Sequence, residues 1–263
     1  MKVSIDNISK SYGKKRALNG VSFEMENGVY GLLGPNGSGK SSLIRILAGI
    51  MEASGGQVRI DGKDRKACDH LYRSKLGYLP QSLNFYPEFT GRDYLRFIAS
   101  LKGVDSKKAQ RKIGELAEQT RLSGDLERKC VNYSGGMKQR LGIVQVLLNN
   151  PEILILDEPT AGLDPQERIK FRNLVSIFSH DRTVLLSTHI VSDIESIAKQ
   201  IIMIKNCEVG KIGTQTSLTQ MIAGKVWLIT MTLEELADYQ EKHIISNVIP
   251  EADRIQARII MDE

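Results

Sequence analysis

The sequence has few of the residues that hold together secreted or zinc-stabilised domains. Its 263 residues include three cysteines. Cys68, Cys130 and Cys207 lie far apart and never at CxxC spacing. An odd number of distant thiols disfavours a disulfide framework and a zinc site, and favours reduced thiols in a cytosolic protein.

Long hydrophobic runs are also lacking. The N-terminal stretch "MKVSIDNISK" has no apolar segment of the kind that a signal peptide contains. Apolar runs such as "ILIL" (153–156) and "IIMI" (201–204) have the length of strands. Because a helix needs about 20 apolar residues to cross a bilayer, we expect a soluble chain.

Neither sign of charge dominates. The net charge of +5 arises from 36 basic and 31 acidic residues. Two short basic clusters, "GKKR" (13–16) and "KKAQRK" (107–112), favour an ordinary solvated surface, with contact to anionic lipid or nucleic acid as the alternative. We expect no nucleic-acid partner. With 41% apolar residues, the chain can form one large domain, alone or with a small appendage.

Two kinds of strand are predicted. The alternating stretches 3–8 and 21–25 are typical of a half-buried antiparallel sheet. Continuous apolar stretches are typical of a parallel sheet covered by helices on both faces, and they occupy 29–33, 77–79, 152–156, 183–187 and 200–204. The intervening helical patterns lie at about 40–50, 166–179 and 190–199.

Two further regions differ from this core. Residues from about 84 to 150 contain no clear strand and are predicted to be a helical insert, with a first helix in 91–103. Beyond about 212 the pattern becomes strand (225–232), helix (233–243) and strand (254–261). We therefore expect an α/β fold with a main domain over 1–212, a helical subdomain within it, and a small α+β appendage over 213–263.

The stretch "GLLGPNGSGKSS" (31–42) matches the phosphate-binding pattern G-x-x-x-x-G-K-[ST]. It follows a predicted buried strand and precedes a predicted helix, which is the context this motif requires. Its glycines let backbone N–H groups surround phosphates, Lys40 can reach the β- and γ-phosphates, and the Ser41 hydroxyl can ligate Mg²⁺. The candidate nucleotide-binding residues of the loop are Gly34, Pro35, Asn36, Gly37, Ser38, Gly39, Lys40, Ser41 and Ser42.

A second buried strand ends in two acidic residues, in "ILILDEPT" (153–160). The carboxyl edge of such a sheet is where ligands bind. Asp157 fits a carboxylate on the Mg²⁺ side, and Glu158 is the candidate to orient or deprotonate an attacking water. The alternative is that Asp157 serves only an ion pair and that Glu158 is structural.

The stretch "VNYSGGMKQRLG" (131–142) combines flexible and helical features. Ser134 precedes an apolar stripe at helical spacing, so it is a candidate N-cap. Capping does not need Gly135 and Gly136, which leave backbone N–H groups open at the positive end of the helix. The pattern predicts an anion-binding segment without identifying the anion.

The order of these motifs, together with "GYLPQ" (77–81), "AGLDP" (161–165) and "LLSTHI" (185–190), resembles the ATP-binding subunit of an ABC transporter. The resemblance covers residues 1 to about 212. It implies an ATPase with ATP and Mg²⁺ as cofactors, which drives transport through closure of a dimer.

The resemblance also implies roles for individual residues. Gln81 would sense Mg²⁺ and the γ-phosphate, His189 would hydrogen-bond the γ-phosphate, and Tyr12 would stack on adenine. Asp164 would belong to a loop that communicates across the dimer, and residues 134–136 would bind the γ-phosphate of ATP held by the other subunit. The alternatives are a solvated loop for Gln81, a structural histidine, a core tyrosine, an ordinary turn at Asp164 and simple helix capping by Ser134.

The implied catalytic set is therefore Lys40, Glu158 and His189, and the implied metal set is Ser41, Gln81 and Asp157.

The signature segment departs from the commonest form, Leu-Ser-Gly-Gly-Gln, because Tyr133 and Met137 flank its core. This version is similar to subunits that export drugs or antimicrobial peptides. The resemblance implies a second ATP-binding subunit, identical or different, a transmembrane permease subunit, and a location at the cytoplasmic face of the cell membrane.

Competing classes fit the sequence less well. A non-transport ATPase of the same fold acting on a soluble partner is the main alternative. The DNA-repair type would need a long coiled-coil insertion between Gln81 and Ser134, and the translation-factor type usually carries two such domains. A P-loop GTPase or small-molecule kinase lacks support, because no N-K-x-D guanine motif is present.

Overall fold

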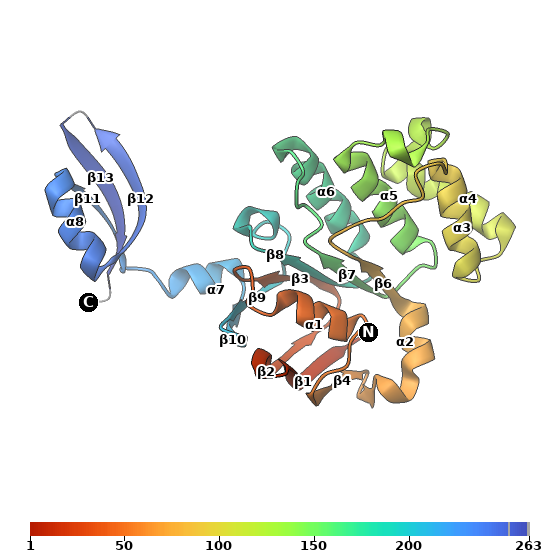
Figure 1. The fold of residues 1–263 in the computed structure, drawn as a ribbon, viewed down its shortest axis with the longest axis horizontal. Coiled ribbons are helices and arrows are strands. Elements are labelled where there is room, and N and C mark those ends of the chain that lie inside the picture. The colour runs from red at the N-terminus through yellow and green to blue at the C-terminus, as the bar shows by residue number, and fades with distance from the viewer. Residues whose placement is uncertain (252, 262–263) are drawn as a thin grey trace. The chain divides into compact units, whose positions relative to one another are not determined.

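The computed structural model describes residues 1–251 and 253–261. Contacts between backbone positions divide the chain into two units, with the boundary between Thr214 and Gln215. Figure 1 shows the elements of both units, and each unit is described by itself.

The first unit is built around a six-stranded sheet with strand order β10-β9-β3-β8-β7-β6. Strands β9, β3, β8, β7 and β6 run parallel to one another. Strand β10 pairs antiparallel with β9 at one edge of the sheet. The strands are β3 (Gly28–Leu33), β6 (Leu76–Leu79), β7 (Ile153–Asp157), β8 (Thr183–Thr188), β9 (Gln200–Lys205) and β10 (Glu208–Gly213). The predicted parallel sheet is confirmed, and β10 is an additional strand.

An antiparallel sheet with order β2-β1-β4-β5 packs beside it. Its strands are β1 (Val3–Tyr12), β2 (Lys15–Met25), β4 (Gly55–Ile60) and β5 (Lys63–Asp64). Helix α1 (Lys40–Leu47) lies between the two sheets (Figure 1). Buried side chains from both sheets and from α1, such as Ile5, Leu18, Leu43 and Leu185, form one continuous core. This burial holds the start of α1 in a defined place.

The region from 84 to 150 is helical, as predicted. Its helices are α3 (Gly91–Leu101), α4 (Ser106–Gln119) and α5 (Gly135–Leu147), with short 3-10 turns at Ser123–Asp125 and Cys130–Asn132. The single β-type pairing described there is an isolated bridge between Thr90 and Lys129. Side-chain oxygens of Thr90, Asp105 and Ser134 accept hydrogen bonds from first-turn N–H groups, so each helix begins at a capping residue.

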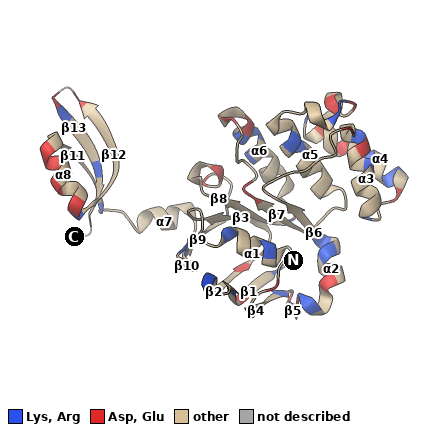
Figure 2. Cartoon of the chain, viewed as in Figure 1, with Lys and Arg blue, Asp and Glu red and all other residues tan. Residues whose placement is uncertain are grey.

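Two further helices complete the unit, α2 (Asp69–Lys75), preceded by a 3-10 turn at Lys66–Cys68, and α6 (Pro165–Phe178). The helix predicted over 166–179 is therefore confirmed as α6. Charged residues of both signs are interleaved along these helices (Figure 2).

The prediction of a helix over 190–199 is wrong. The chain there forms a 3-10 turn at Val191–Asp193 and further turns before it enters β9. The buried side chain of Ile194 lies against Gly31, and the Lys199 N–H bonds to the Val29 carbonyl, so the chain turns down onto β3. Apolar residues at helical spacing here bury a compact turn, because tertiary contacts override local propensity.

The second unit contains α7 (Gln215–Gln220), β11 (Val226–Met231), α8 (Leu233–Lys242), β12 (Ile244–Glu251) and β13 (Arg254–Ile260). Its antiparallel sheet has the order β11-β13-β12, and Leu236 of α8 packs onto Met231, Ile255 and Ile259. The predicted strand, helix and strand are confirmed, and β12 is an additional strand.

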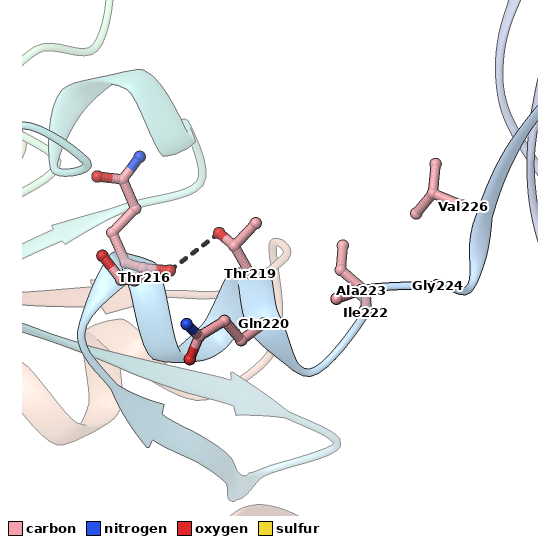
Figure 3. A pocket seen from close by; sticks show the side chains of 8 residues that line it. Thr216, Thr219, Gln220, Ile222, Ala223, Gly224 and Val226 are labelled. Atoms are coloured by element: carbon pink, nitrogen blue, oxygen red, sulfur yellow. Dashed lines mark hydrogen bonds between the residues drawn. The ribbon is translucent and has the colours of Figure 1, made fainter.

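A hollow of about 580 Å³ lies along α7 and the turn that follows it (Figure 3). The Thr219 hydroxyl donates a hydrogen bond to the Gln215 carbonyl at 2.9 Å. The lining side chains carry no charge, so they supply no acid, base or cation: Gln215, Thr216, Thr219, Gln220, Ile222, Ala223, Gly224 and Val226.

Gly77 allows α5 to pack closely against the edge strand β6. A Cβ atom built on Gly77 would overlap Val146 and press on Leu154 at 2.9 Å. We expect Gly77→Ala to lower the free energy of unfolding by about 1–3 kcal/mol, because the overpacked contact must be relieved by moving α5. Urea denaturation followed by circular dichroism measures this change.

Gly114→Ala is the matched control. Gly114 lies exposed on α4 with nothing within 4 Å of the added Cβ. Alanine should raise the free energy of unfolding by about 0.5–1 kcal/mol, because it restricts the unfolded chain. Equal effects of the two substitutions would contradict the proposed contact.

Candidate functional site

The phosphate-binding loop connects the end of β3 to the start of α1. Gly37 and Gly39 have φ angles of 79° and 106°, in the left-handed region that favours glycine. A Cβ at Gly39 would also overlap the Ala17 carbonyl and lie 2.7 Å from Leu18. The loop therefore follows a tight path that only glycine allows at this point, and loops of this kind can turn backbone N–H groups toward a phosphate.

The side chain of Lys40 folds back onto this loop. Its ammonium group donates hydrogen bonds to the carbonyls of Gly34 at 2.7 Å and Pro35 at 3.1 Å. It also lies 3.6 Å from the Glu158 carboxylate and is 4% exposed. A buried ammonium group beside a phosphate-binding loop supplies the positive charge that a polyphosphate requires.

A hollow of about 630 Å³ opens beside the loop. Of the residues predicted to bind nucleotide or to act on it, the hollow brings nine together: Tyr12, Asn36, Gly37, Gly39, Lys40, Ser41, Ser42, Gln81 and Glu158. Its lining does not include Gly34, Pro35, Ser38, Asp157 or His189.

Tyr12 also lines the hollow. Its ring is 46% exposed, its hydroxyl donates to the Met51 sulfur at 2.9 Å, and it lies 3.4 Å from the Ser42 hydroxyl. The Lys10 ammonium is 5.3 Å from the ring centroid. An exposed, fixed aromatic face offers a surface on which a planar base can stack.

The acidic pair at the end of β7 lies directly beside the loop. The Ser187 hydroxyl donates to Asp157 Oδ1 at 2.7 Å and accepts from the Glu158 N–H at 2.9 Å. Glu158 has a φ of 44°, an uncommon backbone conformation for a residue with a side chain. Such a conformation is often found where a functional group must be held in place.

His189 contacts Glu158. Its Nδ1 lies 2.9 Å from Glu158 Oε2, and the imidazole is 43% exposed on the loop after β8. The Glu158 carboxylate thus lies between His189 and Lys40, at the edge of the hollow. This arrangement places a carboxylate, an imidazole and a cation around one point, where a phosphate and an attacking water can be oriented.

The oxygen donors suit Mg²⁺. Burial raises the pKa of Asp157, the Ser187 hydrogen bond lowers it, and the charge of Glu158 raises it again. A buried carboxylate of this kind gains by facing a cation. With the Ser41 hydroxyl and the Gln81 amide, the donors are all oxygens, and Mg²⁺ typically combines a few of these with phosphate oxygens and water. No group of three His, Cys, Asp or Glu among the described residues could hold a metal alone.

Residues 134–136 lie outside this hollow. Ser134 caps α5 by accepting from the Met137 N–H at 3.3 Å, and Ser134 and Gly135 are exposed. A Cβ at Gly136 would overlap the carboxylate of Glu167, so a larger residue here would displace that side chain. The helix N-terminus is open to solvent and contributes nothing to the hollow of its own chain.

Asp164 caps α6, because its Oδ1 accepts from the Glu167 N–H at 2.9 Å. The Glu167 carboxylate in turn binds Lys170 at 2.7 Å and lies 3.8 Å from Arg140 of α5. Glu167 therefore connects the loop that carries Asp164 with the start of α5 at Gly136.

Sequence reasoning missed several residues of the hollow. Lys15, Arg16, Ala17 and Cys207 line it, and Ser187 holds the acidic pair. Cys207 and Arg16 are 191 positions apart, and the Cys207 thiol bonds to the Arg16 carbonyl at 3.4 Å. Only the polar run "STH" after a buried strand could have indicated Ser187.

Comparisons with known proteins agree with this geometry. Residues 18–161 match the family described as "ABC transporter". The chain belongs to the ABC transporter family. It has the P-loop NTPase fold of the ABC cassette, and as an ATP-binding subunit it hydrolyses ATP to power transport.

Individual relatives support the same assignment. The chain is 36% identical over 248 residues to the uncharacterized ABC transporter ATP-binding protein YxlF of Bacillus subtilis (strain 168). The aligned residues cover 94% of this chain and 82% of YxlF. It is also 34% identical over 221 residues to the linearmycin resistance ATP-binding protein LnrL of the same strain. That match covers 83% of this chain and 71% of LnrL.

The solved dimeric structure of MJ0796, a bacterial ABC transporter cassette, superimposes with a TM-score of 0.73 at 26% identity, covering 81% of this chain and 98% of that one.

Lys40→Met tests the centre of the site. Methionine keeps the length of the side chain but removes the ammonium, so we expect ATP hydrolysis to fall by about 10²-fold or more and nucleotide affinity to weaken. Phosphate release and titration with a fluorescent nucleotide measure the two effects.

Lys15→Met provides the control for lost positive charge. Lys15 lines the same hollow but is exposed. Because exposed charges contribute about 0–1 kcal/mol, its hydrolysis rate should stay within about fivefold of the parent rate. Parental hydrolysis by Lys40→Met would refute the assignment of this loop.

Proposed function

We propose that the hollow beside the phosphate-binding loop holds ATP, with adenine stacked on Tyr12 and the γ-phosphate near Lys40, Glu158 and His189. The exposed ring of Tyr12 and the buried ammonium of Lys40 line the same hollow, which supports this orientation. Ser41, Asp157 and Gln81 would hold Mg²⁺, whose charge would stabilise the transferring phosphoryl group. The nucleotide chemistry is thus assigned to the first unit.

Glu158 is proposed to orient or deprotonate the attacking water, and His189 to hydrogen-bond the γ-phosphate. Their 2.9 Å contact supports a shared task. The burial of Glu158 and its positive φ support this role, because both restrain the position of the carboxylate.

The single observation that carries the dimeric mechanism is the open N-terminus of α5. Ser134 and Gly135 offer free N–H groups and lie outside their own nucleotide hollow. We assign them to the γ-phosphate bound by a second ATP-binding subunit, and the similarity to a dimeric cassette supports this assignment. Asp164, whose helix contacts α5 through Glu167, would then sense closure of the dimer.

A permease subunit is the proposed membrane partner. None of the helices in the described part of the chain has the length and apolar character required to cross a bilayer. The helical region carries an exposed aromatic cluster. The ring centroid of Tyr86 lies 5.1 Å from that of Phe89 and 5.5 Å from that of Phe97. Beside it is a hollow of about 210 Å³ lined by Phe85 and Val131, among others. We propose that this surface docks on the permease, which would place the chain at the cytoplasmic face of the membrane.

Export is the proposed direction. The relative LnrL is described as a linearmycin resistance protein, and Nod factor export ATP-binding protein I of Paraburkholderia xenovorans (strain LB400) is 35% identical over 205 residues. The Tyr133 and Met137 version of the signature segment agrees with this class. We therefore propose a subunit of an exporter of drugs, antimicrobial peptides or other substrates.

Glu158→Gln should trap an ATP-bound dimer. Glutamine preserves size but removes the carboxylate, so hydrolysis should fall by about 10²-fold or more while ATP still binds through Lys40. The closed dimer should therefore persist with ATP and be absent with ADP, as size-exclusion chromatography can show.

Adding Ser134→Arg to this variant should abolish the dimer, because the bulky side chain occupies the place of the partner's phosphate. A Glu158→Gln protein that remains monomeric with ATP would contradict self-pairing and would point to a heterodimer. A dimer that is indifferent to nucleotide and to Ser134→Arg would refute the role of residues 134–136.

Tyr86→Glu tests the docking surface. Tyr86 is 52% exposed, so glutamate should leave the fold intact while making insertion into a hydrophobic partner surface unfavourable. We expect at least an order-of-magnitude loss of protein retained on washed membranes of its natural host, comparable to loss of a hot-spot aromatic. ATPase activity of the isolated subunit should be unchanged.

Ile177→Glu is the matched control, because Ile177 is 66% exposed on α6, outside the aromatic cluster. It should leave membrane retention unaltered. Retention of Tyr86→Glu at the parent level would exclude this surface as the permease contact.

A further inference from the structure

A buried carboxylate lies behind the catalytic edge of the sheet. Asp193, in the turn Val191–Asp193 after β8, is 1% exposed. Its Oδ2 accepts a hydrogen bond from the Thr160 hydroxyl at 2.6 Å and another from the Thr188 hydroxyl at 3.0 Å. Both threonines are themselves 2% exposed.

The two threonines belong to two different loops. Thr160 follows Glu158 by two residues at the end of β7, and Thr188 directly precedes His189 at the end of β8. Asp193 therefore connects the segment that carries the proposed catalytic carboxylate with the segment that carries the proposed phosphate-binding imidazole. Ser187 connects the same two segments on the other side, through Asp157 and the Glu158 N–H.

This connection is costly, which indicates that it serves more than packing. The ion pairs found among the described residues do not include Asp193, and the partners of its carboxyl oxygen are two hydroxyl groups. A buried, unpaired carboxylate is unfavourable unless strong hydrogen bonds compensate. An apolar side chain could fill a buried turn without this penalty. Local sequence choices that oppose stability tend to occur at functional sites.

We propose that Asp193 is a positioning residue that sets the 2.9 Å contact between Glu158 and His189, an inference that rests on the catalytic roles proposed above. Asp193 does not contact the nucleotide hollow. Because the hydroxyl groups of Thr160 and Thr188 both donate to one oxygen atom of Asp193, this residue fixes the distance between the two loops. Displacement of a reacting group by about 1 Å can lower a rate by about 10²-fold, so the rate of hydrolysis should depend on this link.

Thr160→Val is the sharpest test, because valine has nearly the shape of threonine and the Thr160 hydroxyl bonds to Asp193. We expect kcat to fall by about tenfold with KM for ATP within about twofold, since only the alignment of the catalytic loops changes. Thr160→Ser retains a hydroxyl and should restore kcat to within about twofold of the parent value. A role limited to stability would instead lower the melting temperature of Thr160→Val and leave kcat unchanged.

Asp193→Ala removes the shared acceptor and should lower kcat at least as much as Thr160→Val. Combined with Thr160→Val it should cause little additional loss, because both substitutions break the same link. On a His189→Ala background, Thr160→Val should also have little further effect. Additive losses in either combination would overturn the proposal. Should Asp193→Ala fail to fold, the Thr160 variants decide by the same criteria.

Asp181→Asn is the control for removal of a carboxylate at the opposite end of β8, away from this link. Asp181 is exposed in the turn before β8, where it contacts His180. Its kcat should equal that of the parent protein.

The outcome also separates this proposal from the proposed function. If Glu158→Gln and His189→Ala hydrolyse ATP normally, the catalytic assignment fails. If both are impaired while Thr160→Val keeps the parental kcat, only the positioning role of Asp193 is refuted.

Discussion

The parallel register of β3, β8 and β7 is the constraint on which the nucleotide site depends. Leu33 pairs with Thr188, and Asp157 pairs with Ser187, so the three strands end at one edge. The phosphate-binding loop, the acidic pair and the loop bearing His189 all begin there. Because successive side chains of a strand point to opposite faces of the sheet, a slip of one residue would turn Asp157 to the other face. Backbone hydrogen bonding thus sets the geometry of the proposed chemistry.

Close packing at this edge requires particular small or polar residues. Gly39 lets the loop pass the Ala17 carbonyl, and Gly31 makes room for Ile194 of the turn that follows β8. Buried hydroxyl groups then join the strands where N–H···O bonds of the sheet end. Ser187 binds the acidic pair, and Asp193 binds Thr160 and Thr188. These links explain why polar residues occur in an otherwise apolar interior.

The helical region presents the second half of the proposed reaction. Ser134 caps α5 at an exposed point and Asp164 caps α6, and the carboxylate of Glu167 in α6 lies 3.8 Å from Arg140 in α5. A partner's phosphate that contacts the start of α5 would therefore act on a segment already connected to the loop of Asp164. The same region carries the aromatic cluster proposed to contact the permease. Contact with the partner's ATP, dimer closure and permease contact would thus share one small group of helices.

The sequence by itself determined the family, the phosphate-binding loop, the parallel strands and the helical insert, because each has a local signal in glycine spacing or hydrophobic periodicity. Tertiary structure alone decided how residues distant in sequence meet. Ser187 and Cys207 carry no strong local signal, and the expected helix over 190–199 became a turn because Ile194 is buried against Gly31. Asp193 is an ordinary residue in the sequence and becomes informative only when two strand ends bring Thr160 and Thr188 to its carboxylate. Such contacts depend on strand order and register, which local patterns do not encode.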